Sequence, residues 1–338
     1  MRLSARLSIA MVKPCRLKLG AALCLLVAGF RTISNDASSF SPHALTGREH
    51  FSPSPETNTG DGLHLAESVG GRVDPTVPHA AAWVPTSVKT RKVGSRGVMP
   101  HFIDRAKPGV IAVTVKGKRF ANEANSYHDF VQDMVKACKD EKEVSAWLLC
   151  DHRTLRQYGL GCVAPFPLPI GRHLRSGYLQ RGGTIAELAK VIGVDTESLQ
   201  ATVDQFNIHA RNGEDPQFAK GSEAYNRYQS DALNQPKPCV APLLTAPYYA
   251  IKLGVGDIGT FAGLATNERR QVLDAQRKPI PGLYAVGNDA ASVMGGNYPG
   301  AGITLGPALT FGCIAGMALA QAAPLAKTAA PSLVRRAA

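Results

Sequence analysis

A glycine-rich stretch near the C-terminus constrains the fold of this chain more than any other segment. Residues 282–316 read as a buried strand, a long turn and an apolar helix, and six glycines fall between Gly287 and Gly306. Because glycine has no Cβ, such a backbone can adopt positive φ and come close to a flat ligand. Pro307 suits the first turn of a helix, where free amides favour an anionic group. The stretch therefore predicts a ligand site at the start of the last helix.

Length and composition narrow the possible classes. The chain has 338 residues, of which 44% are hydrophobic and 7% aromatic, so we expect a globular protein with an aliphatic core and room for two domains. The net charge is +12, but no basic helix with interleaved aromatic residues occurs, so nucleic acid is not expected as a partner. The seven cysteines are widely spaced without a C-x-x-C pair, which favours reduced thiols and no metal site.

The apolar run near the N-terminus allows two interpretations. Residues 19–30 form a twelve-residue apolar run after five basic residues, as in a signal peptide. The run is shorter than the roughly 20 residues of a transmembrane helix, so no stable membrane span is expected. It can also form a buried parallel strand. No A-x-A cleavage site follows, so we expect a cytoplasmic protein, with export as the alternative.

The order of elements predicts an α/β or α+β fold in two lobes. One lobe is formed by residues 88–259. The other is discontinuous, with one part at 1–87, a second part at 260–325 and a disordered tail at 326–338.

Capping signals and apolar periodicity predict individual elements. Thr184 and Glu187 form a capping box, and Asp195 caps a further helix that Gly213 ends. A turn-rich hairpin is expected after residue 253, and a long ordered loop at 214–246. We also expect a short helix within 58–71, a closing helix at 307–320, and strands at 109–115, 248–253, 271–273 and 283–286.

Residues 254–259 match the dinucleotide fingerprint G-x-G-x-x-G. A strand precedes the match, but the residues after it show no amphipathic helix, which the fingerprint requires. We interpret it as a chance match. No G-x-S-x-G elbow occurs either, so hydrolase chemistry has no support.

Polar side chains gather at 117–130, where Arg119, Asn122, Glu123 and Tyr127 are spaced so that several can face one cavity. The alternatives are a solvated helix start and, for Tyr127, packing in the core. His128 is expected to be structural, because no second ligand lies at metal-binding spacing.

Tyr298 precedes the closing helix closely enough for its phenol to reach the space at the helix start. Together with the Gly302 amide it can form a two-donor clamp for an enolate. Residues 58–62, N-T-G-D-G, read as a plain turn with a helix cap or as a contact for a ribityl chain or pyrophosphate.

Together, residues 58–62, 117–130, 247–267 and 282–316 resemble the FAD-dependent flavoprotein family of fumarate reductases and 3-oxosteroid (3-ketosteroid) Δ1-dehydrogenases. The resemblance covers residues 45–320 and leans to the steroid enzymes through Y-P-G-A-G at 298–302. It implies a partial Rossmann-like FAD-binding lobe, an inserted α+β substrate (capping) domain at 88–259, and hydride transfer from substrate to flavin N5. Because the family's opening glycine fingerprint has no match, the chain is identified as an N-terminally incomplete member.

The resemblance also implies roles for single residues. Tyr127 resembles the tyrosine that removes the proton, and Tyr298 and the Gly302 amide resemble the donors that polarise the C3 ketone. A phenol of pKa about 10 needs its anion stabilised, and the second tyrosine that helps in the family has no counterpart segment here. The expected FAD contacts are Thr59, Gly60, Asp61, Gly287, Asn288, Ala301, Ile303, Thr304 and Leu305.

Three functions follow as hypotheses. The first is an FAD-dependent oxidoreductase acting on a 3-ketosteroid or similar cyclic ketone, with the electron acceptor open. The second is reduction of an unsaturated acid, as in fumarate reductases, with Arg105 and Arg119 as proton donor or carboxylate clamps. The third is a non-catalytic remnant without the ADP-binding half of the FAD site.

Overall fold

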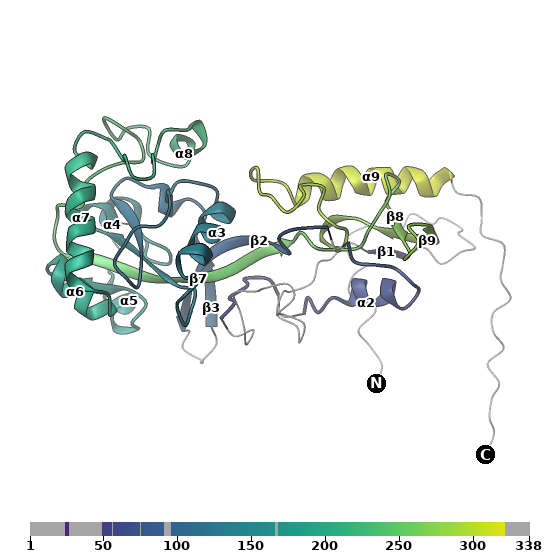
Figure 1. Ribbon diagram of the computed structural model, residues 1–338, viewed down its shortest axis with the longest axis horizontal. Coiled ribbons are helices and arrows are strands. Elements are labelled where there is room, and N and C mark those ends of the chain that lie inside the picture. The colour runs from purple at the N-terminus through teal and green to yellow at the C-terminus, as the bar shows by residue number, and fades with distance from the viewer. Residues whose placement is uncertain are drawn as a thin grey trace, which may run out of the picture.

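The computed structural model describes residues 24–26, 49–55, 57–74, 76–90, 96–165 and 168–321. Figure 1 shows two groups of elements along one long axis, with α3 to α8 at one end and α2, α9, β1, β8 and β9 at the other. The long strands β2 and β7 run between the two groups (Figure 1). In chain order the elements are β1 (Cys24–Leu26), α2 (Asp61–Glu67), β2 (Ala81–Thr90), β3 (Arg96–Pro100), η1 (Asp104–Ala106), β4 (Val110–Thr114), α3 (Tyr127–Ala137), β5 (Ala146–Cys150), α4 (His152–Tyr158), α5 (Gly171–Arg175), β6 (Gln180–Gly182), α6 (Ile185–Ile192), α7 (Thr196–Ala210), α8 (Ala224–Tyr228), β7 (Tyr248–Thr260), β8 (Gln271–Leu273), β9 (Pro279–Ala285), η2 (Gly287–Asp289) and α9 (Leu305–Gln321).

The larger sheet is antiparallel in every recorded pairing and has the strand order β3-β2-β7-β5-β4, with β6 also paired to β7. The first half of β7 pairs with β5, and the second half pairs with β2. The main core lies on this sheet, where Phe130 and Met134 of α3 pack against Leu148 and Ile251. Helices α6 and α7 supply a second cluster together with Ile111.

The expected turn-rich hairpin after residue 253 is wrong, because β7 continues to Thr260. Glycine is required inside this strand by a close approach. A Cβ on Gly256 would lie 2.3 Å from the Phe51 carbonyl oxygen and 2.6 Å from Thr86 Cγ2. The match to G-x-G-x-x-G is therefore strand interior, and its interpretation as a chance match is confirmed.

The smaller sheet has the order β1-β9-β8. Strand β1 pairs with β9 in parallel, with Cys24 opposite Leu283, which supports the strand interpretation of the apolar run for residues 24–26. The rest of that run and the tail at 326–338 lie outside the described residues. Strand β8 has the predicted bounds, whereas β9 begins earlier, at Pro279.

The capping predictions are confirmed. Thr184 accepts a hydrogen bond from the Glu187 amide at 3.1 Å, and Asp195 accepts one from the Ser198 amide at 2.7 Å. The predicted loop at 214–246 contains only the short helix α8. None of the helices in the described ranges is long and apolar enough to cross a membrane.

The mixed helix-and-sheet architecture agrees with the predicted fold class. The division at 87/88 falls inside β2, and the division at 259/260 falls at the end of β7. The domain boundaries therefore stay a prediction.

Candidate functional site

Tyr127 and Tyr298, which lie far apart in the sequence, meet in the structure. Tyr127 is the first residue of α3, and Tyr298 lies in the turn before α9. Their ring centroids are 4.5 Å apart, and the Tyr298 phenol contributes to the raised pKa of Tyr127. Both residues are buried, with 6% and 7% of their surface exposed. The two predicted catalytic tyrosines therefore form one unit.

Neighbouring residues of α3 hold this pair in place. The Ser126 hydroxyl donates to the Tyr298 carbonyl at 3.4 Å. His128 accepts from the Trp83 amide through Nδ1 at 3.1 Å, which leaves Nε2 to donate to the Gly296 carbonyl at 3.2 Å. Burial and the nearby His79 lower the pKa of His128 to about 4, so this imidazole is neutral. The predicted structural role of His128 agrees with these contacts.

The residues packed around the two tyrosines are mostly apolar. The Phe102 ring stands edge-on to Tyr127 at 5.2 Å. Burial and the neighbouring Tyr298 phenol raise the pKa of Tyr127 above its ordinary value of 10, whereas the Arg105 charge lowers it. Tyr225 also raises the pKa of Tyr127 electrostatically, an influence that the sequence did not reveal. The cluster also contains Ala82, Val84, Phe261 and Ile303.

Arg105 is a buried cation next to this pair. Its Cζ lies 4.7 Å from the Phe130 ring centroid. Burial lowers the pKa of Arg105 to about 10, and the charge of Asp104 opposes this shift. The guanidinium donates to four backbone carbonyls, those of Glu123 at 2.6 Å, His101 at 3.0 Å, Asn125 at 3.2 Å and Phe102 at 3.3 Å. Arg105 therefore bonds two segments, residues 101–102 and residues 123–125, and the second of these comes just before Tyr127.

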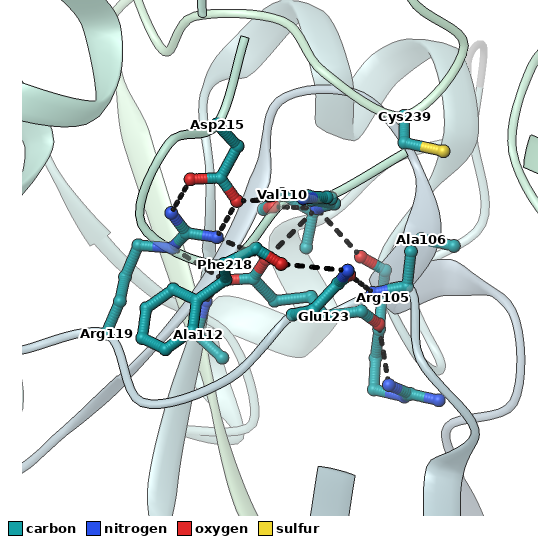
Figure 2. A network of polar contacts seen from close by, with 12 residues as sticks. Arg105, Ala106, Val110, Ala112, Arg119, Glu123, Asp215, Phe218 and Cys239 are labelled. Atoms are coloured by element: carbon teal, nitrogen blue, oxygen red, sulfur yellow. Dashed lines mark hydrogen bonds and ion pairs between the residues drawn. The ribbon is translucent and has the colours of Figure 1, made fainter. Parts of the chain in front are cut away.

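Arg119, Glu123, Asp215 and Lys220 form a buried ionic network (Figure 2). Arg119 bonds Glu123 at 2.8 Å and Asp215 at 2.7 Å, and Lys220 lies 3.4 Å from Glu123. Burial opposes ionisation of Glu123, but the charges of Arg119 and Lys220 outweigh it and lower its pKa to about 2. Arg119 is thus held by the protein's own carboxylates.

The polar side chains at 117–130 do not share one environment, because they bond different partners. Arg119 and Glu123 point into the ionic network, and Asn122 donates to Asn226 at 2.9 Å. Tyr127 faces Tyr298 instead. The expectation that several of these side chains share one cavity is therefore wrong, because the network and the amide bond hold three of them.

The three segments expected to contact FAD are far apart in the sequence but close together in the structure. In the N-T-G-D-G turn the Thr59 hydroxyl donates to Asp61 at 2.5 Å, and Gly60 has φ +84°. A Cβ on Gly62 would lie 2.6 Å from Asp289 Oδ2, so the start of α2 packs directly on η2. On the other side, a Cβ on Gly259 would lie 2.7 Å from Asn288 and 3.7 Å from Thr304.

A small cavity of about 20 Å³ lies at the start of α9. Of the predicted FAD contacts, Gly287, Asn288, Ile303 and Thr304 line it. Ala301, Gly302 and Leu305 are exposed beside it, and Gly302 has φ +94° with open space around it. Thr59, Gly60 and Asp61 do not line the cavity.

Arg270, which sequence reasoning missed, also lines this cavity. Its Nε is buried and has no hydrogen-bond partner among the residues that the structure describes. A buried guanidinium with a spare donor, next to helix amides, fits an oxygen-bearing anionic group such as the edge of a flavin. Within the described ranges, no group of three or more His, Cys, Asp or Glu side chains could hold a metal ion.

Comparison with known proteins found a matching family model and similar dehydrogenases. A family model described as an FAD binding domain matches residues 21–305. The chain is 41% identical over 310 residues to 4-oxocyclohex-2-ene-1-carboxylate 5-dehydrogenase of Sinomonas cyclohexanicum, covering 92% of this chain and 52% of that protein. It is 37% identical over 273 residues to 3-oxosteroid 1-dehydrogenase of Mycobacterium tuberculosis, covering 79% of this chain and 47% of that protein.

A solved structure is similar to this chain in fold and in sequence. The fold matches a 3-ketosteroid Δ1-dehydrogenase from Sterolibacterium denitrificans, solved with 1,4-androstadiene-3,17-dione, with a TM-score of 0.80 and 37% identity. The match covers 88% of this chain and 53% of that one. The chain thus spans about half the length of the curated relatives it matches. With the family model covering most of its length, this chain belongs to the flavoprotein family defined by that FAD binding domain.

Proposed function

We propose that this chain carries the substrate site and part of the flavin site of an FAD-dependent dehydrogenase that acts on a cyclic ketone, such as a 3-ketosteroid or a smaller oxocyclohexane. The observation that carries the proposal is the buried pair of Tyr127 and Tyr298, whose rings are in contact close to the start of α9. The ketone names of the similar dehydrogenases support the substrate class.

In this proposal Tyr298 and the Gly302 amide are the two donors to the ketone oxygen. Polarising a ketone makes the adjacent C–H more acidic, so a nearby phenolate can remove the proton. We assign this role to Tyr127, and the contact of its ring with Tyr298 supports the assignment. FAD, when bound, supplies the hydride acceptor.

Several neighbouring groups support the proposed role of Tyr127 as the base. The carbonyl bonds of Arg105 fix the residues before α3, and the Arg105 charge favours the phenolate. Phe102 and Ile303 supply apolar surface beside the phenols, which suits an alicyclic ring and limits access of water. Gly302 adopts positive φ, so its amide orientation depends on glycine.

Reduction of an unsaturated acid is the second candidate. It requires free cationic side chains for the carboxylate, and the two named for it, Arg105 and Arg119, are bonded to backbone carbonyls and to buried carboxylates. We therefore favour a cyclic ketone over an unsaturated acid as the substrate.

The test is a substrate panel on the FAD-loaded protein. We expect turnover of a 3-ketosteroid or 4-oxocyclohexanecarboxylate with an artificial electron acceptor, and no reduction of fumarate by a reduced dye. Turnover of fumarate alone would contradict the proposal. A colourless, monodisperse protein whose melting temperature does not change with added FAD would favour the non-catalytic alternative.

A further inference from the structure

Arg270 occupies a backbone position that favours glycine. Its φ is +65°, and its amide closes a tight turn onto the Asn267 carbonyl at 2.9 Å just before β8. Residues with a Cβ rarely adopt this conformation because Cβ crowds the following carbonyl. A long cationic side chain at this position is therefore not explained by the turn.

The side chain of Arg270 does not extend into solvent. Only 7% of the residue is exposed, and its Cζ lies 3.2 Å from the Phe311 ring centroid on α9. Nη1 donates to the Thr266 hydroxyl at 2.9 Å, whereas Nε is buried and has no hydrogen-bond partner in the described part of the chain. Among the described residues no carboxylate forms an ion pair with Arg270, and burial lowers its pKa. A buried cation in these surroundings is costly unless an anion joins it.

The space next to Arg270 indicates the kind of anion. The cavity it lines also includes Asn288, Thr304 and Pro307, so it lies at the N-terminal end of α9, where the helix dipole is positive. Its volume of about 20 Å³ is enough for one oxygen-sized group.

We propose that Arg270 is a cofactor-contacting residue whose guanidinium binds the oxygen-bearing edge of the flavin ring, where negative charge gathers on reduction, and so favours the reduced cofactor. The inference rests on the proposed function, since it requires FAD at the start of α9. It adds a role for a residue outside the glycine-rich stretch.

The experiment compares Arg270→Gly and Arg270→Lys with Arg269→Ala, a control that removes the same charge from the exposed neighbour. Glycine fits a φ of +65°, so Arg270→Gly is expected to leave the melting temperature of the FAD-free protein unchanged or to raise it. The measurements are the FAD dissociation constants of the oxidised and reduced protein and the midpoint potential of bound FAD.

For Arg270→Gly we expect binding of reduced FAD to weaken about tenfold more than binding of oxidised FAD. A tenfold change corresponds to a fall of about 30 mV in a two-electron midpoint potential. Arg270→Lys, which keeps the charge without the planar fork, should lie between Arg270→Gly and the wild type. Arg269→Ala should match the wild type.

An unchanged midpoint potential in Arg270→Gly would overturn the inference while leaving the proposed function intact, provided that the wild type binds FAD and oxidises the ketone. Equal weakening of FAD binding in both oxidation states also leaves the midpoint potential unchanged, so it would overturn the inference as well. A wild-type protein that binds no FAD would overturn both the inference and the proposed function.

Discussion

At the scale of single residues, the proposed chemistry depends on Tyr127 as the proposed base and on Arg105 as its proposed electrostatic support. Burial raises the pKa of Tyr127, so its phenol is protonated at neutral pH and only a small fraction is available as the base. Arg105 opposes this shift through its charge, and its guanidinium donates to backbone carbonyls. The resemblance implied the tyrosine pair, but nothing in the spacing of the sequence indicated Arg105 as its support.

The first prediction concerns the pH dependence of turnover in Arg105→Met. Since the base form of Tyr127 is its ionised form, ketone turnover should rise with pH in the wild type. Loss of the cation raises the pKa of Tyr127 further, so the rise moves to higher pH. A change of one pKa unit lowers turnover at fixed pH about tenfold.

Steady-state pH profiles measure this effect, with Arg105→Lys as the charge-retaining control. A purely structural role would lower turnover in both variants without moving the profile. A pH profile of Arg105→Met that coincides with that of the wild type would therefore rule out electrostatic support.

At the scale of elements, the glycines of β7 and α9 serve different purposes. Within β7, Gly256 leaves room for the Phe51 carbonyl, so its environment excludes a Cβ. In α9, a Cβ on Gly312 would have no atom within 4 Å apart from its own helix backbone, among the residues that the structure describes. The sequence shows both as similar glycines, because a contact with a segment 200 residues away leaves no local signal.

The second prediction follows from this difference. Gly256→Ala should lower the free energy of unfolding by about 1–3 kcal/mol, as overpacked cores do. Gly312→Ala should raise it by roughly 0.5–1 kcal/mol, because alanine favours a helix interior. Denaturant unfolding of the two variants measures both, and equal effects would contradict the packing of residues 49–55 on β7.

The third prediction concerns the ionic network, which ties the loop at 214–246 to the strand-and-helix core. Glu123→Gln leaves Arg119 and Lys220 with one buried carboxylate fewer and should cost about 3–5 kcal/mol of unfolding free energy. The pKa of Glu123 is lowered from 4.5 to about 2, so its contribution is complete above pH 4.5 and is lost as pH falls toward 2.

Unfolding free energies of the wild type and Glu123→Gln should therefore converge between pH 4.5 and pH 2. Lys252→Gln, which breaks an exposed pair with Glu143, is the control and should change stability by less than about 1 kcal/mol. A constant difference between wild type and Glu123→Gln across this pH range would show that the carboxylate charge is not what stabilises the network.

At the scale of the whole molecule, the candidate site lies where the two groups of elements meet. Helix α3 belongs to the group around the larger sheet, and the turn with Tyr298 belongs to the group around α9 (Figure 1). The sequence predicted the caps of α6 and α7 and the bounds of β8, since these depend on local signals. Long-range contacts, such as Tyr127 with Tyr298 or Arg270 with Phe311, could not be derived from local periodicity.

The central claim is that FAD and a ketone react at the tyrosine pair, and one anaerobic single-turnover experiment tests it most directly. When the FAD-loaded protein is mixed with a 3-ketosteroid, or with 4-oxocyclohexanecarboxylate, the oxidised-flavin absorbance should disappear in one exponential phase. Tyr127→Phe and Tyr298→Phe should keep bound FAD but slow this bleaching by about 10²–10³-fold. Bleaching at the wild-type rate in both variants, or no bleaching in the wild type, would contradict the claim.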